Sequence, residues 1–155
     1  MARLRNREQL HYVICGEGPD MPFLQKLTRQ LHLEERVHLL GYRTDIPDML
    51  GAADIFCMPS RREGCGMAAL EAMAAGLPLI TVRSHGTKTY AEKGESGFCL
   101  KGDLVTSCAD AIEQLADNKL LRRQMGARNR AAATAFSDAD RMMLLRGYYQ
   151  KALGD

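Results

Sequence analysis

Two glutamates flank a glycine-rich turn near the middle of the chain. From Gly64 to Val82 the sequence reads GCGMAALEAMAAGLPLITV, and Glu71 is the only charged residue in this run. A carboxylate buried without a partner is costly enough that it takes up a proton instead. Glu71 is therefore expected to have a partner from outside the run, or to face a cleft that receives one. With Glu63 in the preceding polar turn, the pair is placed to hold a hydroxylated, phosphorylated ligand.

The turn between the two acids suits an anion. Gly64, Cys65 and Gly66 allow the backbone to approach a ligand closely, and the helix predicted at 67–75 presents free N–H groups at its start. A helix N-terminus carries about half a positive charge and is a ready anion site. The turn is thus suited to a diphosphate without a metal ion, and the alternative interpretation is a plain tight turn.

The two carboxylates differ in how strongly the sequence supports a binding role. The neighbours of Glu71 are Ala, Leu and Met in both directions, which favours a ligand role over a place on a solvated face. A carboxylate accepts two hydroxyl bonds at once, which suits the diol of a ribose. Glu63 would then face the other end of the ligand. Taken alone, Glu63 is equally explained as an exposed charge beside Arg61 and Arg62.

Apolar periodicity predicts strands and helices in alternation, which indicates an α/β fold with a parallel sheet covered by helices on both faces and a helical C-terminal end. The chain is expected to form one domain, 1–155. Strands are predicted at 11–16, 37–41, 54–60, 78–83 and 98–100, and helices at 21–33, 46–53, 67–75, 87–93, 104–116, 118–134 and 138–152.

Ligands of open parallel sheets collect beyond the carboxyl ends of the strands. Four loops rich in glycine and polar residues are predicted at that edge, at 16–20, 41–45, 60–66 and 83–87. We expect them to form one site. The candidate residues in the first three loops, besides the glycine turn, are Gly16, Gly18, Tyr42, Arg43 and Ser60.

Composition narrows the class of protein. Apolar residues make up 46% and charged residues 26%, which is a globular balance, and a net charge of +2 argues against nucleic acid as a partner. Five cysteines without a C-x-x-C pair indicate a reducing, cytoplasmic compartment and no zinc site. The basic start MARLRNREQL resembles the tail of a longer helix, so we interpret the chain as a fragment.

Other motifs are weaker. Gly16-Glu17-Gly18-Pro19 lacks the third glycine of a dinucleotide fingerprint. The aspartates 138 and 140 are better explained as helix caps than as a metal motif. The four histidines have no ligand spacing, and only His85 is predicted at the binding edge.

The segment PSRREGCGMAALEAMAAGLPLI, with seven residues between Glu63 and Glu71, closely resembles the signature of retaining glycosyltransferases of family 4. The similarity extends to VICGEGPD, VHLLGYRTDIPDMLGAADIFCMPS and EKGESGFCL. It implies a Rossmann-like domain, the C-terminal, donor-binding half of a GT-B glycosyltransferase. It further implies that Glu71 binds the ribose hydroxyls and Glu63 those of the transferred sugar. The amides from Gly64 to Ala68, Met67 included, would bind the diphosphate, and the loop of Tyr42 and Arg43 would border the base.

The same resemblance implies a UDP-, GDP- or ADP-sugar donor, transfer with retention and without a metal, and a glycan or lipid-linked acceptor in cell-surface polysaccharide assembly. The acceptor would be bound by an N-terminal domain that is absent here, and the parent would be cytoplasmic or peripherally membrane-associated. The family's usual Arg and Lys ahead of the first strand are also missing, and Cys65 replaces a residue that is often aromatic or aliphatic. We therefore expect the chain alone to bind a nucleotide weakly and to transfer no sugar.

Rival functions remain. A nucleotide-sugar epimerase and a non-catalytic nucleotide-sugar-binding module share the fold. A dinucleotide-dependent oxidoreductase is disfavoured by the glycine pattern. A phospho-receiver domain is disfavoured because Asp54 stands at the wrong end of its strand.

Overall fold

The computed structural model describes residues 1–64, 66–82 and 95–136. Cys65, His85, the predicted helices at 87–93 and 138–152 and the aspartates 138 and 140 lie outside these ranges. The described strands are β1 (Tyr12–Cys15), β2 (Val37–Gly41), β3 (Phe56–Met58), β4 (Leu79–Val82) and β5 (Gly97–Leu100). The described helices are α1 (Met21–Gln30), α2 (Ile46–Ala52), α3 (Met67–Ala75), α5 (Leu104–Asp117) and α6 (Lys119–Ala133), with 3-10 turns η1 (Ala2–Leu4) and η2 (Thr134–Phe136). The alternation predicted from the sequence is confirmed.

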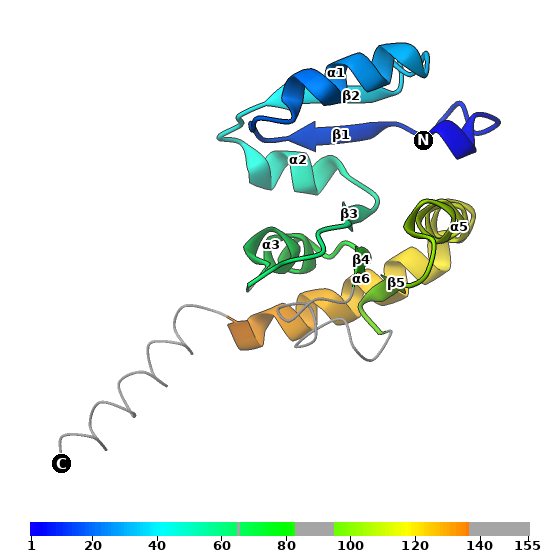
Figure 1. Ribbon diagram of the computed structural model, residues 1–155. Coiled ribbons are helices and arrows are strands. Elements are labelled where there is room, and N and C mark those ends of the chain that lie inside the picture. Colours follow the sequence, from blue (N-terminus) through cyan, green and yellow to red (C-terminus); the bar gives the residue numbers. More distant parts are fainter. Residues whose placement is uncertain (65, 83–94, 137–155) are drawn as a thin grey trace, which may run out of the picture.

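All the strand pairs are parallel, as predicted, but they form two sheets. β1 pairs with β2, and β3, β4 and β5 pair in that order. Figure 1 shows the β1–β2 pair, with α1 along β2, above the three-stranded sheet. No ladder joins the two sheets, so the described strands form two parallel sheets where the sequence predicts one.

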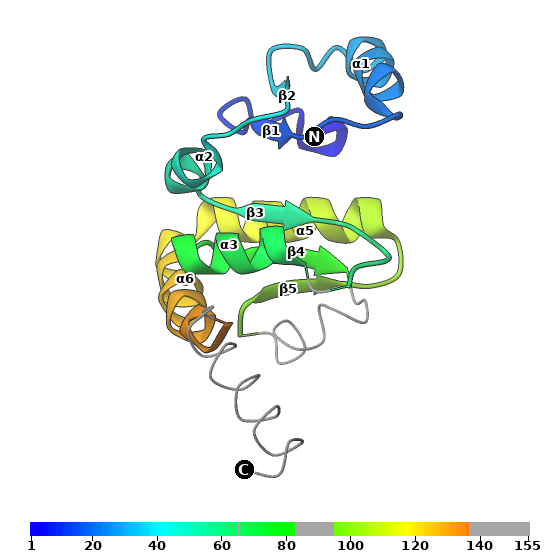
Figure 2. The ribbon, with the colours of Figure 1, turned by 90° about the vertical axis from the view of Figure 1, so that its left-hand side faces the viewer.

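The three-stranded sheet is covered on both faces, as the sequence predicts. Successive side chains of a strand point to opposite faces. Phe56, Met58 and Leu79 accordingly pack with α3 residues, whereas Cys57 and Ile80 pack with residues of α5. Figure 2 shows α3 in front of this sheet and α5 behind it. The buried apolar side chains of both faces form the core that fixes α3.

α6 packs closely against the end of α3. Gly126 is required at this crossing, because a Cβ there would lie 2.0 Å from the carbonyl oxygen of Gly76. Beyond this point the buried Asn129 donates through Nδ2 to the carbonyls of Leu77 (2.7 Å) and Ser96 (2.8 Å). α6 thus links the segments that precede β4 and β5.

The N-terminal segment is tied to the rest of the chain by two arginines. Arg36 donates to the carbonyls of Leu4 (2.9 Å), Arg7 (2.7 Å) and Leu10 (3.1 Å). Arg7 in turn forms two hydrogen bonds with the carboxylate of Asp117 at the end of α5. The segment predicted as the tail of a helix contains one 3-10 turn and is otherwise held by these contacts.

Candidate functional site

The turn into α3 is built on a left-handed glycine. Gly66 is the N-cap of α3 with φ 68° and ψ 50°, and no side chain caps the helix. Its carbonyl oxygen accepts from the N–H groups of Ala69 and Leu70 at 2.8 and 3.1 Å. The first N–H groups of a helix have no intrahelical partner. Those of Met67 and Ala68 therefore remain available at the positive end of α3, as the sequence predicts for a diphosphate site.

Glu71 lies on the outer face of α3. Met67, Ala68, Glu71 and Ala74 are exposed, whereas Ala72 and Met73 are fully buried. Helical side chains lean toward the N-terminus and lie over the residues three and four positions earlier. The carboxylate of Glu71 is thus directed back toward Met67 and Ala68. No described residue forms a hydrogen bond or ion pair with it, so it is free to bind a ligand.

Glu63 and Ser60 lie in the loop between β3 and α3. Both are half-buried, whereas Arg61 and Arg62 beside them are exposed. The partial burial separates Glu63 from the ordinary exposed charge that the sequence left as an alternative. The loop begins directly after the three residues of β3, so the core around Phe56 and Met58 sets where the loop starts.

The loops after β1 and β2 are joined to each other. The N–H of Gly16 donates to the carbonyl of Gly41 at 2.7 Å, and the N–H of Tyr42 donates to Oε1 of Glu17 at 3.4 Å. Gly18 closes the first loop by accepting from the N–H of Met21 at 3.1 Å. The ring of Tyr42 is 73% exposed and is available to a ligand. The sequence did not single out Glu17, whose position between two glycines is the only signal for this role.

Arg43 is engaged within its own loop. Its guanidinium forms a bidentate pair with the carboxylate of Asp45, the residue that precedes α2. The hydrogen bonds from Arg43 lower the pKa of Asp45, and the same hydrogen bonds raise the pKa of Arg43. Arg43 is therefore a side chain that orders the loop. To contact a ligand directly, its guanidinium must break one or both of its hydrogen bonds with the Asp45 carboxylate.

The predicted residues form two groups in the described chain. Gly16, Gly18, Tyr42 and Arg43 belong to the joined loops of the β1–β2 pair, and Ser60, Glu63, Gly64, Gly66, Met67, Ala68 and Glu71 belong to the β3–α3 unit. No hydrogen bond or ion pair between described residues links one group to the other. Cys65 lies outside the described residues.

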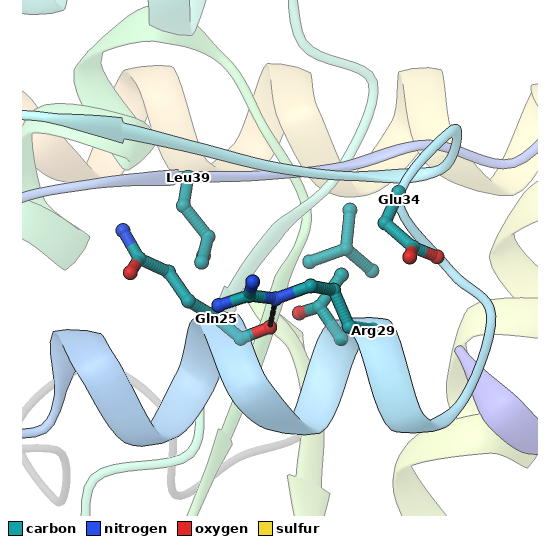
Figure 3. Close-up of a pocket in the computed structure, with 6 residues that line it drawn as sticks. Gln25, Arg29, Glu34 and Leu39 are labelled. Carbon is teal, nitrogen blue, oxygen red and sulfur yellow. Dashed lines mark hydrogen bonds between the residues drawn. The ribbon is translucent and has the colours of Figure 1, made fainter.

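A surface groove of about 290 Å³ lies elsewhere, between α1 and β2. It is lined by Gln25, Thr28, Arg29, Glu34, Val37 and Leu39. Figure 3 shows side chains of α1 and β2 facing one another across it, with Arg29 Nε donating to the Gln25 carbonyl at 3.3 Å. None of the predicted site residues lines this groove, and its mixed polar and aliphatic lining does not resemble an anion site.

Two features are absent from residues 1–64, 66–82 and 95–136. Within them, no three side chains among His, Cys, Asp and Glu are grouped in a way that would hold a metal ion. Over the same ranges, no helix combines the length and the apolar character required to cross a membrane.

Comparison with known proteins assigns the family. The model of glycosyl transferases group 1 matches residues 1–132, and the chain belongs to this family. It is 35% identical over 119 residues to N-acetyl-alpha-D-glucosaminyl L-malate synthase of Bacillus anthracis, covering 76% of this chain and 31% of that protein. It is 35% identical over 111 residues to UDP-Gal:alpha-D-GlcNAc-diphosphoundecaprenol alpha-1,3-galactosyltransferase of Escherichia coli, covering 71% and 29% respectively. The chain therefore spans about a third of the length of these relatives.

Solved structures share the fold. The pneumococcal O-GlcNAc transferase GtfA, determined in complex with UDP and GlcNAc, has a TM-score of 0.87 at 22% identity, over 98% of this chain and 31% of that one. A glycosyltransferase from Rickettsia africae has a TM-score of 0.89 at 18% identity, over 98% and 42%. The fold is therefore that of a glycosyltransferase domain, as the resemblance implied.

Proposed function

We propose that this chain is the nucleotide-sugar-binding domain of a retaining glycosyltransferase. The observation that carries the proposal is the start of α3, where a left-handed glycine leaves the N–H groups of Met67 and Ala68 free and Glu71 follows one turn later on the same exposed face. A diphosphate at these amides would place the attached ribose within reach of the Glu71 carboxylate. Membership of the glycosyl transferases group 1 family and the UDP bound by GtfA support this assignment.

The other site residues take roles around that anchor. Glu63, half-buried in the loop before α3, binds hydroxyls of the transferred sugar. Tyr42, in the loop that Glu17 and Gly41 hold in place, borders the base. Ser60 and Gly64 shape the loop that carries Glu63. As the diphosphate leaves, negative charge develops on it, and the helix amides stabilise that charge without a metal ion.

The acceptor and the setting belong to the proposal as well. The relatives named above include an enzyme that acts on a diphosphoundecaprenol-linked sugar, which supports a glycan or lipid-linked acceptor. The acceptor would be bound by a part of the parent protein beyond this chain, in cell-surface polysaccharide assembly at the cytoplasmic side. This chain alone is expected to bind the donor weakly and to transfer no sugar.

Titration of backbone amide shifts with UDP, GDP and ADP tests the binding site. Amide shifts detect even millimolar binding, which corresponds to about 4 kcal/mol. The expected result is a set of shifts at Gly66, Met67, Ala68 and Tyr42 with one of the three nucleotides.

Glu71→Ala should abolish these shifts. Glu35→Ala, which removes an exposed carboxylate from the turn before β2, is the matched control and should retain them. Shifts confined to the α1–β2 groove, or unchanged in Glu71→Ala, would contradict the proposed site. Assay of the full-length parent with a nucleotide-sugar alone would separate transfer from epimerisation.

A further inference from the structure

Two cysteines from distant parts of the sequence, one in β3 and one in α5, lie against each other. The Sγ of Cys57, in β3, is 3.7 Å from the Sγ of Cys108, in α5. Both residues are half-buried. Cys15 and Cys99 are also free, and neither has another described thiol beside it. The juxtaposition is therefore specific to one pair among the described cysteines.

The surroundings hold both thiols in place. Cys57 and Cys108 pack on the cluster formed by Ile80, Leu100, Ala111 and Leu115. Burial raises the pKa of the Tyr12 hydroxyl in β1 to about 12, with the two thiols as a smaller electrostatic cause. The pair thus lies in the packed layer between β3 and α5, which restricts both side chains.

The two thiols differ in reactivity. The hydrogen bond between them lowers the pKa of Cys108 to about 7 and raises that of Cys57, which burial raises further. The thiolate is the nucleophilic form of cysteine. The lowered pKa makes Cys108 the better candidate for the attacking sulfur, with Cys57 as the neighbour that resolves the product.

We propose that Cys57 and Cys108 form a reversible disulfide when the protein meets hydrogen peroxide. The Cys108 thiolate attacks one peroxide oxygen and breaks the O–O bond. This gives a sulfenic acid, and the second oxygen leaves as hydroxide, which is protonated to water. The Cys57 sulfur then attacks the Cys108 sulfur, and the sulfenic oxygen leaves as water with the Cys57 proton. In total, two thiols are oxidised and one peroxide is reduced to two waters, and a dithiol reductant reverses the change.

Formation of the bond shortens the distance between the two sulfurs from 3.7 Å to about 2.0 Å. Its effect is to fasten β3 to α5. β3 ends at Met58, two residues before Ser60, so the cross-link fixes the base of the loop that carries Glu63.

The sequence provides a direct test. Cleavage after arginine and lysine places Cys57 in peptide 44–61 and Cys108 in peptide 102–119, and each of the five cysteines falls in a separate peptide. The reduced, purified chain is treated with one equivalent of hydrogen peroxide, its remaining thiols are alkylated, and the digest is analysed by mass spectrometry. The expected product is a 44–61/102–119 conjugate, lighter by two hydrogens than the two peptides together and separated by dithiothreitol.

Matched variants secure the assignment. Cys57→Ser and Cys108→Ser should each abolish the conjugate, whereas Cys99→Ser should leave it unchanged. In Cys57→Ser, Cys108 should instead accumulate as sulfenic acid, detected with a dimedone probe. Conjugates distributed over other cysteine pairs, or alkylation of all five cysteines after peroxide treatment, would overturn the proposal. Circular dichroism of each variant confirms that it is folded.

Discussion

The backbone N–H of Gly16 donates to the carbonyl oxygen of Gly41 at 2.7 Å, and this bond joins the loops that leave β1 and β2. Gly41 adopts a left-handed conformation, φ +67°, to present that carbonyl, and the next residue, Tyr42, donates to Glu17. The position of the exposed Tyr42 ring thus depends on one glycine.

Gly41→Ala is expected to destabilise the fold by about 1–2 kcal/mol, the cost of a left-handed conformation for a residue with a Cβ. Thermal unfolding measures this. Gly51→Ala is the matched control, because Gly51 lies in α2 with open space around it and a normal φ. The control should be neutral or stabilising, by up to about 1 kcal/mol. Equal effects of the two substitutions would contradict the assigned role of Gly41.

Asn129 is expected to be sensitive to loss of its amide. Asn129→Ala removes the donor shared by the carbonyls of Leu77 and Ser96, and a buried group left unsatisfied costs about 1–3 kcal/mol. Asn129→Asp should destabilise further at neutral pH, because a carboxylate would then be buried facing carbonyl oxygens. Denaturant unfolding measures both variants. Gln124→Ala, at an exposed position of the same helix, should change stability little, and a similar loss there would argue against the buried bonds as the cause.

The acid limb of the stability curve should depend on Asp103. Its carboxylate caps α5 by accepting from Thr106 and from the N–H of Val105, and these hydrogen bonds lower its pKa. A carboxyl with a lowered folded-state pKa contributes stability that is fully present above its unfolded pKa, about 3.9, and is lost as pH falls through the folded-state value.

Asp103→Asn should therefore reduce the loss of unfolding free energy as the pH falls below about 4. The asparagine keeps an acceptor for the N–H of Val105. Thermal melts between neutral pH and strong acid show the slope. Asp110→Asn removes the same charge from an exposed position of α5 and should leave the slope unchanged. If the stability of Asp103→Asn and of the unmodified chain fell equally steeply with pH in acid, Asp103 would not be the cause of the acid dependence.

The sequence predicted α3 most accurately. The predicted range 67–75 and the observed Met67–Ala75 coincide, because Gly66 and Gly76 both adopt left-handed conformations that bound the helix. The expectation of free N–H groups at its start followed from the same glycine. The strands were predicted unevenly. The prediction 37–41 coincides with β2, whereas 54–60 was expected where β3 is only Phe56–Met58, since an apolar run does not show where hydrogen bonding stops.

Two features lay beyond sequence patterns. Strand pairing is a long-range property, so alternation of apolar runs cannot show that β1 and β3 lack a ladder. The environment of Glu71 was also hard to infer, because its neighbours are mostly alanines, which occupy both faces of α3. Ala72 is buried and Ala68 and Ala74 are exposed, so an alanine-rich run indicates little about which side of a helix is covered.

The division into two sheets also has a thermodynamic consequence. The loops after β1 and β2 belong to one hydrogen-bonded unit and α3 to the other. A ligand that contacts both units holds them together. The cost of fixing their relative position lowers its net binding free energy. With such a ligand bound, the two units unfold together, so binding increases the cooperativity of unfolding.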